Sequence, residues 1–313
     1  MTSDVVTTLV SLLIFPGLVF TAVVGMLATW VDRKVTARIQ WRVGPPLLQP
    51  FYDFFKLLGK EVIVPKGASK VVFLAAPLVG LAGATLAASL LGTAALNRSA
   101  GFAGDLIVLV YLLVIPSLAI ILGAGASANP YASVGASREI KLVLGYELPF
   151  IISVLVAVVK SGGEFTMTGL LAYQYEHHAF AASVSGVLAL VVAILCMQAK
   201  LALVPFDQAE AETEIMSGAF VEYSGAPLGI FKLTRAMMYL VMPVFLIVTF
   251  WGGFGTSVTG AVLGVLKYVA LLVIMILIRN TNPRLKIEHA VKFFWGPVTL
   301  LAVLAIILAF AGV

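Results

Sequence analysis

Long apolar runs alternate with short polar connections along the whole chain. A helix needs about 20 apolar residues to cross a bilayer core about 30 Å thick, because each residue advances it by about 1.5 Å. Eight runs meet or approach that length: Val6–Trp30, Val71–Leu91, Leu106–Leu122, Leu142–Val159, Val184–Val204, Met237–Trp251, Val262–Ile278 and Phe293–Val313. The pattern predicts an all-α, polytopic membrane protein with about eight transmembrane helices in a single membrane domain, residues 1–313.

The first polar connection, residues 31–70, contains a helical pattern of another kind. Gly44, Pro45 and Pro46 predict a turn. After the turn, apolar and polar residues form two opposing stripes at helical spacing. The apolar stripe comprises Leu47, Leu48, Phe51, Phe54, Phe55 and Leu58, and the polar stripe comprises Gln49, Asp53, Lys56 and Lys60. We therefore expect an amphipathic helix that lies in the membrane interface.

Composition and charge agree with this picture. Hydrophobic residues make up 61% of the chain and charged residues 11%, whereas soluble domains carry about 25% charged residues. The net charge of +5 does not indicate nucleic-acid binding, because the basic residues follow the predicted topology. The connections after odd-numbered helices hold 17 of them: Arg33, Lys34, Arg38, Arg42, Lys56, Lys60, Lys66, Lys70, Arg138, Lys141, Lys200, Lys232, Arg235, Arg279, Arg284, Lys286 and Lys292.

The connections after even-numbered helices hold only Arg98 and Lys160, and Lys267 lies within a run. Basic residues concentrate on the cytoplasmic side of membrane proteins. The chain is therefore predicted to have cytoplasmic odd-numbered connections and both termini outside.

Cofactor ligands are scarce. Cys196 is the single cysteine, and one thiol cannot hold an iron–sulfur cluster, which needs about four ligands. We expect it to be a small buried residue. His177 and His178 lie together in a polar connection without further His or Cys at metal-ligand spacing. The sequence predicts no metal site and no cofactor in this chain.

Acidic residues are also scarce, 15 in 313, yet they gather in the stretch "PFDQAEAETE". The group comprises Asp207, Glu210, Glu212 and Glu214, with Glu222 close behind. If the chain is helical from Pro205, then Asp207, Glu210 and Glu214 share one face. Carboxylates in adjacent turns repel one another, which favours proton binding near neutral pH. The group is either a hydrated surface or a proton relay, and its position against an apolar run favours the relay.

Two further carboxylates lie in "REIKLVLGYELPF". Glu139 is expected at the cytoplasmic edge of the fourth span and Glu147 within it. An ionised glutamate in hydrocarbon costs a few kcal/mol, so an intramembrane carboxylate faces protein or water and is a candidate for a proton or ion pathway.

These motifs resemble a known family. "ARIQWRVGPPLLQPFYDFFKLLGKE", "YELP", "PFDQAEAETE", "VEYSG" and "RLKIEHAVKFFW" are similar to the core membrane subunit of respiratory complex I that joins the peripheral arm to the membrane arm. They resemble still more its counterpart in energy-converting membrane-bound nickel–iron hydrogenases. The compact "RVGPPLLQP" replaces the insertion around a "GPN" turn that is typical of quinone-using members. It resembles the hydrogenase branch, which includes ferredoxin-driven and sulfur-reducing relatives, and "NPYASVGASREI" points to the same branch.

The resemblance implies a place in the heel of an L-shaped complex in the prokaryotic cytoplasmic membrane. It implies ion or proton coupling by Glu139, Glu147, Asp207, Glu210, Glu212, Glu214 and Glu222. It implies contact with the peripheral arm by Arg33, Arg38, Arg42, Asp53 and Lys56. Electron transfer is assigned to neighbours with iron–sulfur clusters and a nickel–iron centre: hydrogenase-like large and small subunits and an iron–sulfur subunit. Antiporter-like membrane subunits are further expected partners.

The expected function is thus a non-catalytic, ion-coupling core subunit of a ferredoxin-dependent, energy-converting hydrogenase-type complex that moves protons or sodium ions. One alternative is the quinone-chamber subunit of a proton-pumping NADH dehydrogenase or its deazaflavin-using counterpart. A stand-alone secondary transporter is a third hypothesis. It is disfavoured because the chain has no inverted repeat.

Overall fold

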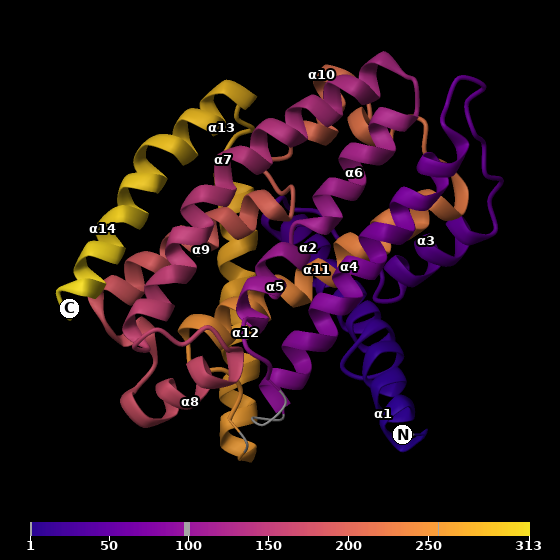
Figure 1. The fold of residues 1–313 in the computed structure, drawn as a ribbon. Helices are drawn as coiled ribbons and strands as arrows, with labels where there is room; N and C mark the ends of the chain where they lie inside the picture. Colours follow the sequence, from indigo (N-terminus) through magenta and orange to yellow (C-terminus); the bar gives the residue numbers. More distant parts are fainter. Residues whose placement is uncertain (1, 97–100, 256) are drawn as a thin grey trace.

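The structure, a computed structural model, describes residues 2–96, 101–255 and 257–313, with the side chains of residues 2–5, 212 and 213 excepted. This part of the chain is helical and contains no strand, so the predicted all-α class is confirmed. Figure 1 shows the helices side by side in one bundle. Their bounds are α1 Thr2–Leu13, α2 Leu18–Ile39, α3 Gln49–Leu58, α4 Lys70–Leu96, α5 Asp105–Leu112, α6 Ile115–Ala126, α7 Pro130–Lys160, α8 Met167–His177, α9 Val184–Lys200, α10 Glu212–Ile215, α11 Gly225–Phe250, α12 Val258–Thr281, α13 Ile287–Phe293 and α14 Thr299–Phe310.

Short elements join some of these helices. Three 3-10 turns span Phe180–Ala182, Gln208–Glu210 and Gly218–Phe220, and a π-helical turn at Phe294–Val298 links α13 to α14. The π-helical turn contains Pro297, which has no N–H for a regular helical hydrogen bond.

Seven segments of the described chain are long and apolar enough to cross a membrane, and α9 is a shorter apolar helix. Each of the eight predicted runs corresponds to one of these segments. Two runs are broken, however. The first divides into α1 and α2 around Pro16, and the third divides into α5 and α6 just before Pro116. A proline removes a helical hydrogen bond, and hydrophobicity alone does not reveal the interruption.

Several helix boundaries differ from the predicted runs. The fourth run is predicted to begin at Leu142, but α7 begins at Pro130. The fifth run is predicted to continue to Val204, but α9 ends at Lys200. The sixth run is predicted to begin at Met237, but α11 begins at Gly225. The first turns of α11 contain Lys232 and Arg235, which lower the local hydrophobicity without interrupting the helix.

Polar side chains fix several helix starts. Asn129 accepts a hydrogen bond from the backbone N–H of Tyr131 at the start of α7. Thr166, Ser183 and Ser257 make the same kind of bond at the starts of α8, α9 and α12. Such caps satisfy N–H groups that have no partner within the helix.

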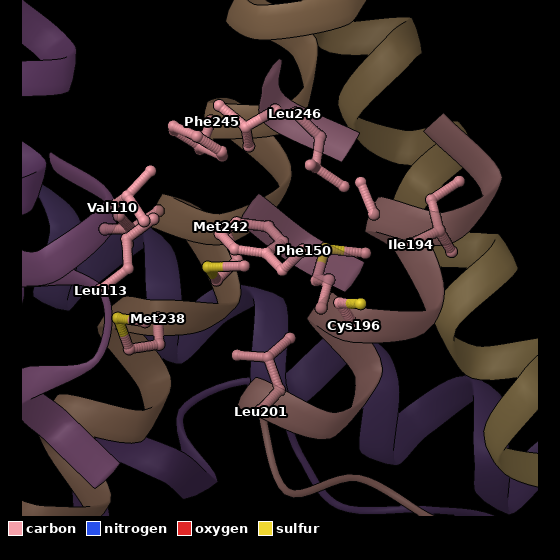
Figure 2. Packing of buried hydrophobic residues seen from close by; sticks show 14 of the residues in the cluster. Val110, Leu113, Phe150, Ile194, Cys196, Leu201, Met238, Met242, Phe245 and Leu246 are labelled. Atoms are coloured by element: carbon pink, nitrogen blue, oxygen red, sulfur yellow. The ribbon is translucent and has the colours of Figure 1, made fainter. Parts of the chain in front are cut away.

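Helix α11 is the most buried span and packs against α2, α4, α9 and α12. Helices α7, α9 and α14 pack together beside it. Figure 2 shows the core between these groups, where Phe150 of α7, Cys196 of α9 and Met242 of α11 meet. Cys196 is buried and unbridged, which confirms the expectation of a buried cysteine.

The amphipathic segment forms α3, so the predicted helix is confirmed. Phe54 and Leu57 pack against Gly229 of α11, whereas Phe55 and Leu58 are exposed. In Figure 1, α10 lies at the top of the bundle, whereas α8 and the start of α1 lie at the bottom. This arrangement agrees with the predicted separation of the two sides. Which side faces the cytoplasm stays a prediction.

Candidate functional site

The acidic stretch after α9 is not one helix. Gln208–Glu210 forms a 3-10 turn, Ala211 interrupts it, and α10 contains only Glu212–Ile215. The expected single helical face with Asp207, Glu210 and Glu214 is therefore wrong. Close packing against α7 fixes the loop in its irregular path.

Two glycines permit this packing. Gly218 has a positive φ of 51°, and a Cβ atom there would lie 1.9 Å from the carbonyl oxygen of Ala209. A Cβ atom on Gly135 of α7 would lie 2.5 Å from the backbone nitrogen of Ala219. Only glycine accommodates both the left-handed conformation and these short approaches.

Each described carboxylate of the loop is bound by a different basic or amide side chain. Arg284, between α12 and α13, donates to Asp207 at 2.7 Å. Arg235 of α11 donates to both oxygens of Glu210 at 2.7 Å. Arg138 of α7 donates to Glu214 at 2.5 Å, and Asn129 donates to Glu222 at 2.5 Å. The side chain of Glu212 lies outside the described part of the structure. The loop thus connects carboxylates to several helices and does not present a row of mutually repelling charges.

A cavity of about 310 Å³ lies behind this loop, enclosed by α6, α7, the end of α9 and α11. Its charged lining residues are Glu139, Lys200, Glu210, Lys232 and Arg235. Ser117 and Tyr223 add hydroxyl groups to the wall. Burial raises the pKa of Tyr223, so this phenol stays protonated, and it donates to the carbonyl oxygen of Phe73 at 3.0 Å. The structure therefore brings two of the predicted coupling residues, Glu139 and Glu210, to one cavity together with three basic side chains, Lys200, Lys232 and Arg235.

Glu139 has the most unusual environment of these residues. The sequence places it at the cytoplasmic edge, but it is only 2% exposed. Its Oε2 atom is buried and makes no hydrogen bond with the described residues. Buried polar atoms in proteins almost always have partners, so an unpartnered carboxylate oxygen requires an explanation. Four other buried side-chain atoms of the described residues share this property: Gln198 Oε1, Asp207 Oδ1, Gln208 Oε1 and Thr249 Oγ1.

Glu147 lies eight residues further along α7, which corresponds to about 12 Å along the helix axis. Lys200 donates to its Oε2 atom at 2.7 Å. The Lys200 side chain is 1% exposed, and its ammonium nitrogen lies 5.0 Å from the ring centre of Tyr146 and 4.6 Å from that of Phe150. Lys200 also lines the cavity that Glu139 and Glu210 line.

A second buried ion pair joins α2, α12 and α11. Arg279 of α12 donates to Asp32 of α2, which is 4% exposed, and Tyr239 of α11 donates to the same carboxylate at 3.4 Å. Tyr239 lies one turn beyond Arg235 on α11.

The residues expected at the peripheral arm form a separate group around α2 and α3. Arg33 donates to Asp53 at 3.1 Å, and Gln49 donates to the other carboxylate oxygen at 2.7 Å. Partial burial raises the pKa of Asp53, but these hydrogen bonds outweigh it and bring the pKa below its ordinary value. Arg38, Arg42 and Lys56 are exposed. The structure brings Arg33 and Asp53 together and leaves the other three accessible to a partner.

Lys200, Arg235, Asp32 and Tyr146 are site residues that the sequence did not identify. The two cations were counted only as evidence of topology. The sequence contained a pattern that could have identified both as site residues. Lys200 and Arg235 are charged residues that directly adjoin or interrupt apolar segments. Asp32 follows an apolar run in the same way, whereas nothing local distinguishes Tyr146.

Metal ligands do not assemble in the described residues, where no group of three or more His, Cys, Asp or Glu side chains has the geometry to hold an ion. His177 stacks on Tyr173 in α8, with ring centres 4.3 Å apart. The site is built from ionisable side chains around a cavity.

Known proteins share this fold and sequence. The profile of the NADH dehydrogenase family matches residues 11–310. A subunit of the NADH-quinone oxidoreductase of Thermomicrobium roseum is 33% identical over 301 residues, which cover 89% of this chain and 88% of that protein. The corresponding subunit of Syntrophotalea carbinolica is 31% identical in an alignment of 327 positions, which covers 99% of this chain and 98% of that protein.

A solved structure is also similar. A chain of the membrane-bound sulfane sulfur reductase, an archaeal respiratory membrane complex, superimposes with a TM-score of 0.86 at 28% identity, over 97% of this chain and 99% of that chain. The sequence motifs, the helical bundle and these matches agree. The chain belongs to the NADH dehydrogenase family and is a complex I-like membrane subunit.

Proposed function

We propose that this subunit couples electron transfer in a peripheral arm to ion translocation across the membrane, without catalysing electron transfer itself. The observation that supports this role most directly is the buried Glu139 carboxylate, whose Oε2 atom has no described partner. It shares a cavity with the Glu210–Arg235 pair and with Lys200, the partner of Glu147. Because these groups share one cavity, the charge of the Glu139 carboxylate depends on the positions of Glu210, Arg235 and Lys200.

The proposed sequence of events begins at the acidic loop. A charge change in the adjoining peripheral arm shifts Glu210 relative to Arg235. The guanidinium group then stabilises the Glu139 anion to a different degree, so Glu139 gains or loses a proton. Lys200 responds to the new charge and alters its bond with Glu147. The loop and its ion pairs thus act as the element with two arrangements that coupling requires.

The energies are compatible with this mechanism. Moving one charge against a potential of about 100 mV takes about 2.3 kcal/mol. That energy corresponds to a change of between about one and two pKa units in a coupled carboxyl group. An opposite charge that moves toward or away from a carboxyl group changes its pKa by about 1–3 units, which is large enough.

For the wider complex, we propose a ferredoxin-dependent, energy-converting hydrogenase-type assembly. Its expected partners are hydrogenase-like large and small subunits, an iron–sulfur subunit and antiporter-like membrane subunits. The compact first loop supports this branch, as does the similarity to the sulfane sulfur reductase. The cytoplasmic membrane is the expected location, with both termini outside.

A quinone-chamber subunit of a proton-pumping dehydrogenase is the second candidate. The two similar relatives from NADH-quinone oxidoreductases favour it. The apolar part of the cavity wall, which includes Phe220, Leu228 and Phe231, is compatible with a hydrophobic ring. Partner identification separates the two candidates: a nickel–iron large subunit favours the first, and a flavin module with quinone reductase activity favours the second.

Replacement of Glu139 by Gln tests the coupling role in the intact complex reconstituted in sealed vesicles. Glutamine preserves the size of the side chain and removes its titratable charge. We expect electron transfer to an artificial acceptor to persist and ion translocation to fall to the level of vesicles without the complex. The matched control is Glu176→Gln on the exposed part of α8, which should change neither rate. Unchanged ion translocation by Glu139→Gln at equal electron flux would refute the proposal.

A further inference from the structure

A second, larger cavity is lined by the next part of α11, at Leu240, Val241 and Val244. Its volume is about 450 Å³, and its walls come from the α1–α2 junction, α4, α11 and α12. All four walls belong to segments that are long and apolar enough to cross a membrane. We propose that this cavity binds one acyl chain of a membrane phospholipid.

The chemistry of the walls excludes polar occupants. Thr21 and Tyr268 are the hydroxyl-bearing residues among those that line the cavity. The Thr21 hydroxyl donates to the carbonyl oxygen of Gly17 at 2.6 Å, and the Tyr268 hydroxyl donates to that of Tyr239 at 3.3 Å. Neither hydroxyl hydrogen is therefore available to the cavity. Apolar cavities of this kind stay free of water and accept apolar ligands.

Two packing features create the cavity. The ring of Pro16 lies against Gly92 of α4, where a Cβ atom would be only 2.2 Å from the proline Cγ atom, and this contact fixes the α1–α2 junction. On the other side, α12 buries Leu271, Leu272, Met275 and Ile276 in its second half. Its first half buries only Gly264, which lies against Phe254. The space between these elements is consequently unfilled.

The cavity is accessible from one side. Leu91 of α4 and Val241 of α11 are buried at its inner wall. Phe20 of α2 and Val265 and Val269 of α12 also line it, but 39%, 57% and 45% of their surfaces are exposed. In a bilayer these exposed side chains contact hydrocarbon. An acyl chain can therefore enter between α2 and α12 directly from the lipid phase.

The volume matches a single chain. An apolar cavity of about 150 Å³ accommodates benzene, so about 450 Å³ accommodates on the order of 18 carbon atoms. A whole helix of a partner subunit does not fit inside the cavity, because a cylinder about 10 Å wide fills about 420 Å³ in a single turn. A quinone ring is also unsuitable, since its carbonyl groups would find no donor in these walls.

The proposal can be tested by photocrosslinking in membranes. The native complex is reconstituted with a phosphatidylcholine that carries a diazirine in the middle of one acyl chain. After detergent washing and irradiation, crosslinked residues are identified by mass spectrometry. We expect crosslinks at the buried inner wall, at Leu91 and Val241, in addition to those on the exposed outer faces of the bundle.

Two cavity-filling variants sharpen the test. Val269→Phe fills the mouth from an exposed position, and Ala95→Phe fills the wall of α4. Both should lose the crosslinks at Leu91 and Val241 and keep those at Leu300 of α14. The control Leu304→Phe, on the exposed face of α14, should keep all of them. Absence of crosslinks at the inner wall would overturn the proposal, as would their persistence in both filled variants. Displacement of the lipid by an isoprenoid quinone carrying the same diazirine would overturn it as well.

Discussion

The ammonium nitrogen of Lys200 lies 2.7 Å from a carboxylate oxygen of Glu147, although 53 residues separate them in the chain. The lysine side chain is almost completely buried, whereas the glutamate side chain is 21% exposed. Each residue would be unfavourable alone within the bundle, and each is made tolerable by the other. Because Lys200 also lines the cavity that contains Glu139, this pair extends the charged site from the loop into the span.

Breaking this pair should be more harmful than removing it entirely. Lys200→Met leaves the Glu147 carboxylate without its cation and should destabilise the subunit by about 3–5 kcal/mol. The double replacement Lys200→Met with Glu147→Gln should recover much of that stability, because no uncompensated charge remains. Thermal unfolding of the purified complex measures both effects. Equal stability of the single and double variants would contradict this interpretation. Ion translocation should be lost in both.

Glu210 is expected to contribute more to ion translocation than Glu214. Glu210 lines the cavity and is bound through both oxygens by Arg235, whereas Glu214 is bound by Arg138 and does not line the cavity. Glu210→Gln should abolish ion translocation in sealed vesicles, and Glu214→Gln should reduce it only slightly.

The double variant gives an independent check on these two carboxylates. Since they bind different arginines on different helices, the effects of the two replacements on stability should add. Strong non-additivity would instead restore the hypothesis of one coupled proton-binding unit.

Gly218 should be required for the path of the acidic loop. Gly218→Ala forces a non-glycine residue into a positive φ, which costs about 1–2 kcal/mol, and places a Cβ atom against Ala209. We expect faster amide hydrogen exchange in residues 208–222 and lower ion translocation. Gly125→Ala is the matched control, because a Cβ atom on this α6 glycine meets no atom within 4 Å. If exchange in the loop is equally slow in both variants, the close approach is not important for its stability.

The orientation in the membrane can be measured by cysteine labelling. Cys196 is buried, so Cys196→Ser provides a background for single cysteines. A membrane-impermeant maleimide should label Glu176→Cys from outside intact cells. Lys66→Cys and Asn282→Cys should react only after the membrane is opened. The reverse pattern would contradict the orientation inferred from the basic residues.

Local sequence patterns predicted the helices well, because burial in a bilayer depends on the apolarity of a contiguous segment. The amphipathic pattern after Gly44 similarly predicted α3. The division of two runs near Pro16 and Pro116 and the early start of α11 do not follow from apolarity. Apolarity averaged along a run reveals neither a break inside it nor a helix that continues through Lys232 and Arg235.

The candidate site was predicted only in part. The scarcity of acidic residues drew attention to Glu139, Glu147 and the loop, and the structure places Glu139 and Glu210 at one cavity. It also contradicts the single-helix interpretation of the loop. The loop follows this path because the glycines at positions 135 and 218 have no Cβ atom and allow a close backbone approach. A helical pattern in the sequence does not reveal such an approach.

By itself, the sequence determined that this is a polytopic membrane subunit, which residues lie in or beside its spans, and to which family its motifs belong. Tertiary structure alone decided which charges meet. Arg284 reaches Asp207 across 77 positions, and Arg138 reaches Glu214 across 76. The physical reason is that electrostatic interactions depend on distance and burial in space, and helix packing sets both. Apolarity is a property of the segment itself, whereas the charge state of a carboxylate is a property of its neighbours.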